Sequence, residues 1–229
     1  MFDAPEPGEN PALDILAALE KQAVSEEFDL RAHYPLEMAV PGVARICQHY
    51  VGIDTMAVHG GRTPEDANDL LIYGDTPAPV LYRLLRRWGI KPTDVFYDLG
   101  CGCGMAVFAG ALLAKKAVGI DMVARAVDFC RRSETVLQAG NVEFIQADIL
   151  DVDIREATFI YIASTTFPKE FRQKLRKKLG QCASGTKIVS VTHPMDGDGV
   201  KHIAQVPMVF SWSGSGEGFP FNFHFHIRS

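Results

Sequence analysis

Three features of the sequence predict an α/β fold with a doubly wound, mainly parallel sheet of about seven strands. Short apolar runs alternate with helix-forming runs between residues 94 and 191. The first apolar run, 94–98, ends in an acid, and three glycines follow it at alternate positions. Near the C-terminus, strand-like segments at 206–212 and 219–227 flank a glycine-rich turn, which predicts an antiparallel hairpin. Together these features indicate a Rossmann-like sheet that ends in a C-terminal antiparallel hairpin.

The alternation of apolar and helix-forming runs predicts that the strands between residues 94 and 191 are parallel. Each apolar run is short enough for a buried strand, and each intervening run is long enough for a helix that crosses back to the next strand. Such repeated strand–helix–strand units give parallel strands. The sequence predicts strands at 94–98, 117–120, 142–147, 158–163 and 187–191, with helices at 105–115, 122–139 and 169–179.

An amphipathic helix is expected just before the first strand. Val80, Leu84 and Trp88 are spaced to lie on one apolar face. Arg83 and Arg87 fall on the opposite face. We therefore expect the arginines of this helix to be solvated.

Residues 1–70 lack this alternation and are expected to form a small N-terminal helical extension, while residues 71–229 form the main domain. Apolar residues at helical spacing predict helices at 12–21 and 43–51, and Pro41 is expected to break the chain into short pieces. The extension could serve as a lid, a substrate selector or a dimer surface, and the sequence does not choose between these roles.

Composition restricts the class of protein. The chain has 229 residues, 47% of them hydrophobic, and a net charge of −5, which gives no support for bulk nucleic-acid binding. No apolar run reaches the ~20 residues of a membrane span, and the first residues lack the pattern of a signal peptide. Five scattered cysteines suit a reducing compartment. These features predict a cytoplasmic protein without membrane contact.

Two groups of side chains have the residue types of a metal site, but neither has the spacing. Cys101 and Cys103 have no second cysteine or histidine pair at ligand spacing along the sequence. His224 and His226 alternate with phenylalanines in the last predicted strand, so they are expected to form its polar face. No metal site is predicted.

The glycine turn after the first strand indicates which nucleotide would bind there. A dinucleotide site needs the spacing G-x-G-x-x-G, and in either frame of this turn the third position holds a methionine or a valine. Asp98 at the strand end would also repel a diphosphate and suits a ligand with a cationic group. S-adenosylmethionine carries an ammonium and a sulfonium and no phosphate. The D-x-G-x-G-x-G pattern over 98–104 resembles the motif of S-adenosylmethionine-dependent methyltransferases of the seven-β-strand class.

Acids also end the second and third predicted strands. Asp121 is placed to accept hydrogen bonds from the ribose hydroxyls of an adenosine, with Met122 beside it. Asp148 can accept a hydrogen bond from the adenine amino group, and Ile149 can lie on the ring. One acid at a strand end is commonly a turn residue, but three after consecutive strands indicate a cofactor site.

The resemblance extends beyond the glycine motif. The stretches 73–76 (Tyr-Gly-Asp-Thr) and 211–214 (Ser-Trp-Ser-Gly) are similar to segments of the histone lysine methyltransferases of the disruptor-of-telomeric-silencing family, and residues 97–192 also resemble small archaeal protein-lysine methyltransferases. The resemblance covers roughly residues 70–229. It implies N-methylation of protein lysine, with the first stretch closing over the methionine end of the cofactor. The candidate cofactor-binding residues are Tyr73, Thr76, Asp98, Gly100, Gly102, Gly104, Asp121, Met122, Asp148 and Ile149.

The methyl acceptor is expected to meet the cofactor just after the fourth strand. Where the family has an asparagine pair, this sequence reads Ala-Ser-Thr-Thr-Phe over 163–167. Hydroxyls there can orient an incoming amine, and aromatic side chains can favour its neutral form. The candidate residues at the acceptor are Tyr73, Ser164, Thr165 and Phe167. The expected partner is a protein substrate or a small-molecule methyl acceptor, and a cofactor-binding module without turnover is the remaining alternative.

Overall fold

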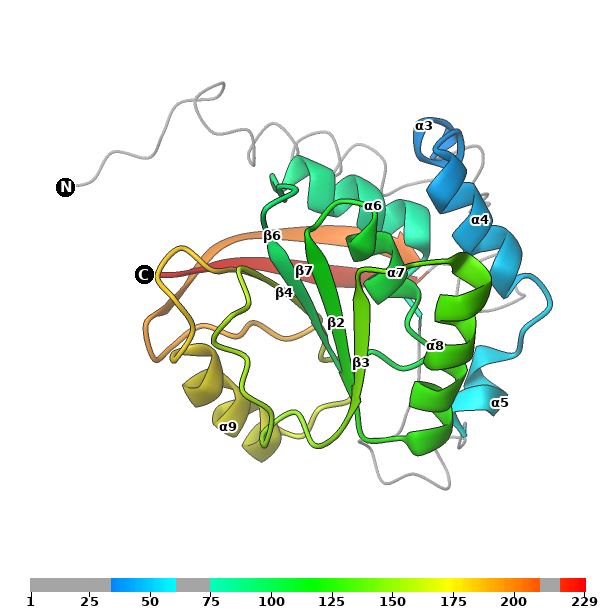
Figure 1. Cartoon of the computed structure of the whole chain (residues 1–229). Helices are drawn as coiled ribbons and strands as arrows, with labels where there is room; N and C mark the ends of the chain where they lie inside the picture. The colour runs from blue at the N-terminus through cyan, green and yellow to red at the C-terminus, as the bar shows by residue number, and fades with distance from the viewer. Residues whose placement is uncertain (1–33, 61–74, 211–218) are drawn as a thin grey trace.

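The computed structural model describes residues 34–60, 75–210 and 219–229 (Figure 1). The helix expected at 12–21, Tyr73 and the 211–214 stretch lie outside these described residues. None of the described helices combines the length and the apolar character that crossing a bilayer requires.

The described residues form a seven-stranded sheet in the order β3-β2-β1-β4-β5-β7-β6 (Figure 1). The strands β1 to β5 are parallel, which confirms the doubly wound arrangement. β7 pairs antiparallel with both β5 and β6, which confirms the C-terminal hairpin. The strands are β1 (Val95–Leu99), β2 (Lys116–Asp121), β3 (Val142–Gln146), β4 (Phe159–Ala163), β5 (Lys187–Val191), β6 (Val200–Phe210) and β7 (Phe219–Arg228).

β6 begins at Val200, whereas the sequence pattern places its start at 206. A β-bulge between His202 and Ala204 shifts the register, so polar and apolar residues do not alternate strictly along this part of the strand. A search for period two therefore misses its first half. Pro207 is tolerated because β6 is an edge strand of the sheet.

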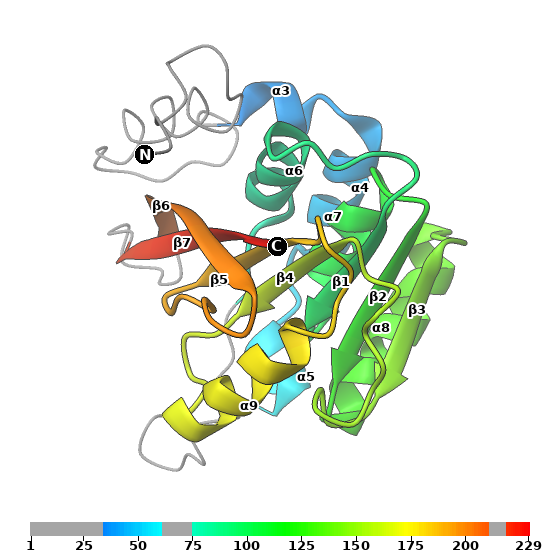
Figure 2. The same cartoon turned by 90° about the vertical axis from the view of Figure 1, so that its left-hand side faces the viewer.

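Helices cover both faces of the sheet (Figures 1 and 2). α6, α7 and α8 pack together with α4 on the face that carries Phe96 and Phe159. α9 packs through Leu175 on the face that carries Ile160 and Ile188. The helices are α3 (Pro35–Met38), α4 (Pro41–Tyr50), α5 (Thr55–His59), α6 (Ala78–Arg87), α7 (Met105–Ala111), α8 (Ala124–Leu137) and α9 (Lys169–Leu179).

The bounds of α4, α7 and α8 differ from the sequence expectation, which placed α8 at 122–139. Two of these differences have local reasons. α4 is the helix expected at 43–51, but it begins at Pro41, because a proline in the first turn needs no N–H partner. α7 ends at Ala111, since the chain must turn before β2 begins at Lys116. Asn141 Nδ2 donates to the carbonyl of Ala111 at 2.9 Å and so satisfies the end of the helix.

The expectation that Arg83 is solvated is wrong. Arg83 is 7% exposed, its guanidinium bonds both carboxylate oxygens of Glu37 at 2.6 and 2.9 Å, and it lies over the ring of Tyr34 at 4.1 Å. Residues 34–38 cover this side of α6, which the sequence of α6 alone does not reveal. Arg86 and Arg87 are exposed, as expected.

The polar face expected on the last strand is buried. His224 is 5% exposed and His226 is fully buried. β7 lies between β5 and β6, and the chain after β5 covers this face, where the backbone N–H of Met195 donates to His226 Nε2 at 3.0 Å. Burial lowers the pKa of His226 to about 4. Among the described residues, no group of three or more histidine, cysteine or acidic side chains could hold a metal ion.

Candidate functional site

A glycine loop joins the end of β1 to the start of α7. The N–H groups of Gly100 and Cys101 donate to the carbonyl of Ile120 at 2.9 and 3.0 Å, which holds the loop against the end of β2. Gly104 has a φ of 83°, and a Cβ there would lie 2.8 Å from Cys130 Sγ. A glycine is required at this position, because other residues rarely adopt this conformation and the thiol leaves no space.

Asp98 lies on β1 just before this loop and is 2% exposed. Its Oδ1 atom has no hydrogen-bond partner among the described residues. Burial raises the pKa of this carboxyl well above its usual range, and the nearby Asp121 and Asp75 raise it further. A buried carboxylate with an unused acceptor is costly unless a ligand supplies a donor or a cation. The surroundings of Asp98 therefore suit a cationic ligand group.

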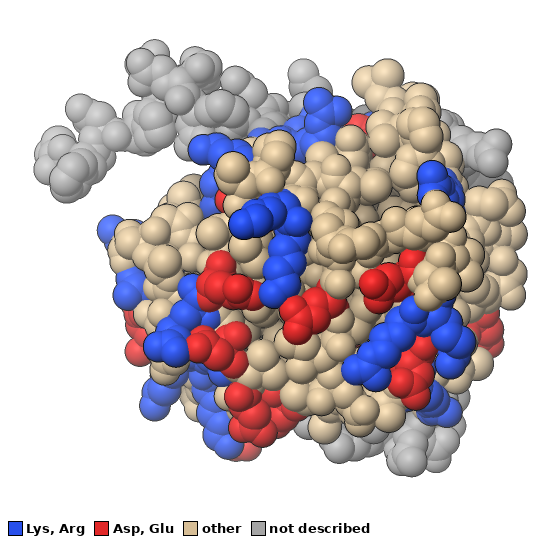
Figure 3. Space-filling model, viewed as in Figure 1, with Lys and Arg blue, Asp and Glu red and all other residues tan. Residues whose placement is uncertain are grey.

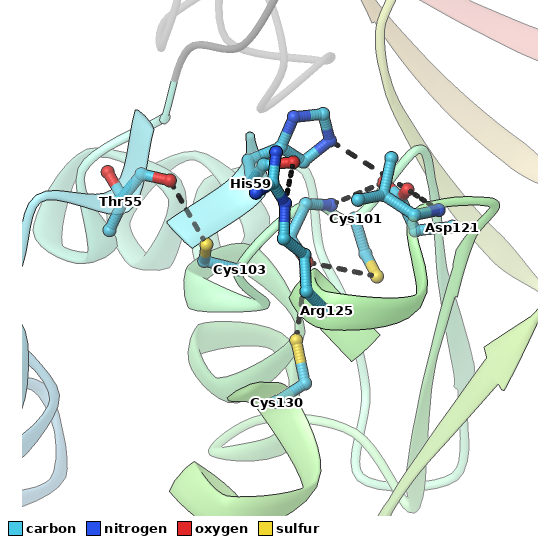
Figure 4. A network of polar contacts seen from close by, with 9 residues as sticks. Thr55, His59, Cys101, Cys103, Asp121, Arg125 and Cys130 are labelled. Carbon is cyan, nitrogen blue, oxygen red and sulfur yellow. Dashed lines mark hydrogen bonds and ion pairs between the residues drawn. The ribbon is translucent and has the colours of Figure 1, made fainter. Parts of the chain in front are cut away.

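Asp121 ends β2 and is 6% exposed. Its Oδ2 accepts from the N–H of Gly102 at 2.8 Å, and its Oδ1 accepts from the N–H of Val123 at 2.9 Å. These bonds fix the orientation of the carboxylate, and each oxygen keeps a second lone pair for a ligand hydroxyl. Figure 4 shows this carboxylate beside the ring of His59, whose Nε2 lies 3.8 Å from Oδ1.

The other candidate cofactor residues divide into buried and exposed ones. Ile149 is buried, and its Cδ1 would lie 3.9 Å from a Cβ placed on Gly100. Thr76 is buried, and its hydroxyl bonds the hydroxyl of Tyr161, which neighbours Asp98 in the register of β1 and β4. By contrast, Asp148 is exposed, with its carboxylate bound to the N–H of Leu150, and Met122 is 55% exposed.

The loop after β4 is tied to the end of β5 by hydroxyl groups. Ser164 is fully buried and its Oγ donates to the carbonyl of Val191 at 2.5 Å. The hydroxyls of Thr165 and Thr192 lie 2.8 Å apart. Phe167 is 9% exposed, and its Cζ would lie 3.3 Å from a Cβ placed on Gly100. The structure thus brings Phe167 to the glycine loop, while the two candidate hydroxyls have partners within the protein.

Basic residues of α9 hold the loops at this edge of the sheet. Each of three cations donates to a backbone carbonyl, and the three carbonyls follow different strands, namely β3, β4 and β5. These loops are therefore fastened to one helix. The pairs are Arg172 with Phe167, Arg176 with Pro194 at 2.9 Å, and Lys178 with Leu150 at 2.8 Å.

Sequence reasoning missed the contribution of α4 and α5 to this site. The hydroxyl of Tyr50 donates to the carbonyl of Cys103 in the glycine loop at 2.6 Å, and Cys103 Sγ lies 3.5 Å from the carbonyl of Thr55. His59, the last residue of α5, faces Asp121 (Figure 4). Asp54 as the N-cap and Gly60 after the last residue indicate in the sequence where α5 begins and ends. They do not indicate which part of the protein α5 packs against.

A doubly wound sheet with a glycine loop after β1, a buried carboxylate before the loop and a second acid at the end of β2 defines an S-adenosylmethionine-dependent methyltransferase. Solved structures agree with this class. An RNA methyltransferase from Salinibacter ruber, in complex with S-adenosyl-L-homocysteine, has a TM-score of 0.51 and 30% identity over 68% of this chain and 94% of that chain. A putative RNA methyltransferase from Pyrococcus horikoshii has a TM-score of 0.55 at 16% identity, covers 76% of this chain and 96% of that one, and supports the fold alone.

The family model described as "Histone methylation protein DOT1" matches residues 67–201, and the chain belongs to this family. It is 30% identical over 138 residues to a protein-lysine N-methyltransferase of Saccharolobus islandicus, covering 58% of this chain and 84% of that protein. It is 29% identical over 174 residues to an H3 lysine-79 specific histone-lysine N-methyltransferase of Caenorhabditis elegans, covering 69% of this chain and 17% of that protein.

Proposed function

We propose that the protein N-methylates lysine side chains of protein substrates. The observation that carries this proposal is the uncharged loop 163–167, which has no ionisable side chain and sets Phe167 against Gly100. A lysine amine has an ordinary pKa of about 10.4 and attacks a methyl group only when it is neutral. An uncharged, largely buried wall favours that neutral form. The similarity to the archaeal protein-lysine methyltransferase, of which this chain covers 84%, supports the same substrate class.

The proposed roles of the site residues follow from their burial and partners. Bound S-adenosylmethionine supplies an electrophilic methyl group on a positively charged sulfur. Asp98 would hold the ammonium of the cofactor through its unused Oδ1, and Asp121 would accept from the ribose. Ile149 would lie on the adenine, and Thr76 would lie near the methionine end together with Tyr73, which is outside the described residues. Positioning and exclusion of water are the main requirements of such a transfer.

RNA is the second candidate substrate. It is favoured by the Salinibacter ruber structure, which is described as an RNA methyltransferase and is 30% identical to this chain. The charge of the chain gives RNA less support, because the net charge is −5 and acidic and basic side chains are interspersed over the face seen in Figure 3. Protein lysine is therefore the leading proposal.

The proposal is tested with S-adenosylmethionine that carries a labelled methyl group. The purified protein is incubated with a lysine-rich protein mixture, with the same mixture after acetylation of its amines, with total RNA, and with a pool of small metabolites. We expect label in the first mixture, mapped by mass spectrometry to the lysine Nε, and none in the acetylated mixture. Asp98→Asn is the loss-of-function control, and it should reduce transfer to every acceptor.

Each alternative gives a different result in the same assay. Label only in RNA would overturn the lysine proposal and support the second candidate. Label only in a pool of small metabolites would indicate a small-molecule methyltransferase with the same fold. Cofactor binding without transfer to protein, RNA or metabolites would overturn both proposals in favour of a binding module.

A further inference from the structure

His59 lies next to the acid proposed to bind the ribose. Its Nε2 is 3.8 Å from Asp121 Oδ1, and the residue is 7% exposed (Figure 4). This separation is too long for a direct hydrogen bond between the two side chains. At this separation, an atom that lies to one side of the line between Nε2 and Oδ1 can be within hydrogen-bond distance of both.

A ribose hydroxyl has the required size and chemistry. A hydroxyl oxygen about 2.8 Å from each of two atoms can bridge a gap of this width. It can donate to a carboxylate and accept from an imidazole N–H at the same time. We propose that His59 is a second ribose-binding residue, whose Nε2–H donates to the hydroxyl that donates to Asp121.

The backbone around His59 is fixed in a way that fits this role. Arg125, in the first turn of α8, donates from Nε to the carbonyl of His59 at 3.0 Å. Gly60 has a φ of 103°, and a Cβ there would lie 1.2 Å from Arg125 Nη2, so the guanidinium packs directly on this glycine. Asp54 caps the other end of α5 by accepting from the N–H of Ala57 at 2.9 Å. The end of α5 is thereby held above the end of β2.

A ribose contact from His59 would place part of the adenosine site before the residues that the family model matches. The family model matches residues 67–201, whereas His59 lies before it. The N-terminal helices would therefore contribute directly to the choice of nucleoside. They would do so by requiring a hydroxyl at one position of the sugar.

The test compares ligands that differ by one hydroxyl, using calorimetric titration of the full-length protein. The ligands are S-adenosylhomocysteine and its 2′-deoxy and 3′-deoxy analogues, and the proteins are wild type, His59→Ala and His59→Gln. We expect His59→Ala to weaken binding of S-adenosylhomocysteine roughly 3- to 10-fold, the range of one hydrogen bond. With one of the two deoxy analogues, wild type and His59→Ala should bind equally. His59→Gln should recover part of the affinity, because its amide can donate near the same place.

The matched control is His202→Ala. His202 is exposed on β6, which is separated from β2 by four strands of the sheet, so this change should leave the affinities for all three ligands unaltered. An equal loss for His59→Ala with all three ligands would overturn the proposal, because His59 would then act through the fold. No loss with any of the three ligands would overturn it also. Absence of S-adenosylhomocysteine binding by the wild type would overturn it together with the cofactor role of Asp121.

Discussion

Replacing Asp98 with asparagine should have opposite effects on the free protein and on the cofactor complex. The amide keeps the size of the side chain and removes the charge from a residue that is 2% exposed. In the free protein it removes a buried carboxylate whose Oδ1 has no partner among the described residues. We therefore expect the free energy of unfolding at pH 7 to rise by about 1–3 kcal/mol. For a chain of this length each kcal/mol corresponds to roughly 2–4 °C in Tm.

The direction of the pKa shift gives this gain a pH dependence. Because burial raises the pKa of Asp98, the folded protein holds the proton more tightly than the unfolded chain, whose carboxyl has an ordinary pKa of about 3.9. The wild type therefore loses stability at this group as the pH rises above about 4, and the asparagine variant does not. The difference in unfolding free energy between the two proteins should be small near pH 4 and larger at pH 7.

The same variant should bind the cofactor more weakly, because it loses a charge-assisted hydrogen bond to the ammonium. Such a bond contributes about 1.5–3 kcal/mol, so the Kd for S-adenosylmethionine should rise roughly 10- to 150-fold. Calorimetric titration measures the affinity, and thermal unfolding with and without cofactor measures the stability. Asp128→Asn, on the exposed side of α8, is the matched control and should change neither quantity. Wild-type affinity in Asp98→Asn, or a lower Tm of the free variant, would refute the reasoning.

Two further predictions concern stability alone. Glu37→Gln leaves the buried guanidinium of Arg83 without its carboxylate, so the unfolding free energy measured in urea should fall by about 3 kcal/mol. A loss no larger than that of an exposed ion pair would contradict the burial of Arg83. Burial, together with the neighbouring His202 and His224, lowers the pKa of His226 to about 4, whereas an unfolded histidine has a pKa of about 6.5. The stability contributed by neutral His226 should therefore be complete above pH 6.5 and fall by up to about 3 kcal/mol as the pH drops toward 4. Urea unfolding at pH 7, 5.5 and 4.5 measures this, and a flat profile would count against it.

The parts of the fold that a local pattern determines could be predicted from the sequence. β5 and α9 have the predicted bounds, because a short apolar run defines the strand and an amphipathic run between Pro168 and Gly180 defines the helix. The glycine loop and the three acids behind consecutive strands were also predictable, since their spacing follows the chain and the parallel order of the strands brings them to one edge.

The parts that depend on packing between distant segments could not be predicted in this way. Arg83 lies on the polar side of its own helix, and it is buried only because Glu37 and Tyr34 cover it. His226 alternates with phenylalanines, a pattern typical of a half-exposed strand. It is buried because β7 pairs with a strand on each side and the segment that contains Met195 covers this face. His59 reaches Asp121 only through the packing of α5 on α8. In each case the deciding partner lies far away in the sequence.

The contacts between α9 and the neighbouring loops have a consequence for how such an enzyme could change its substrate. Arg172, Arg176 and Lys178 bond to main-chain oxygens, which every amino acid possesses. The bond from Arg172 to the carbonyl of Phe167 therefore does not depend on the side chains of the loop after β4. The bonds from the hydroxyls of Ser164 and Thr165 to the end of β5, by contrast, are lost when those side chains change. Substitutions in this loop can thus alter the surface that meets an acceptor while α9 still holds the backbone of the loop.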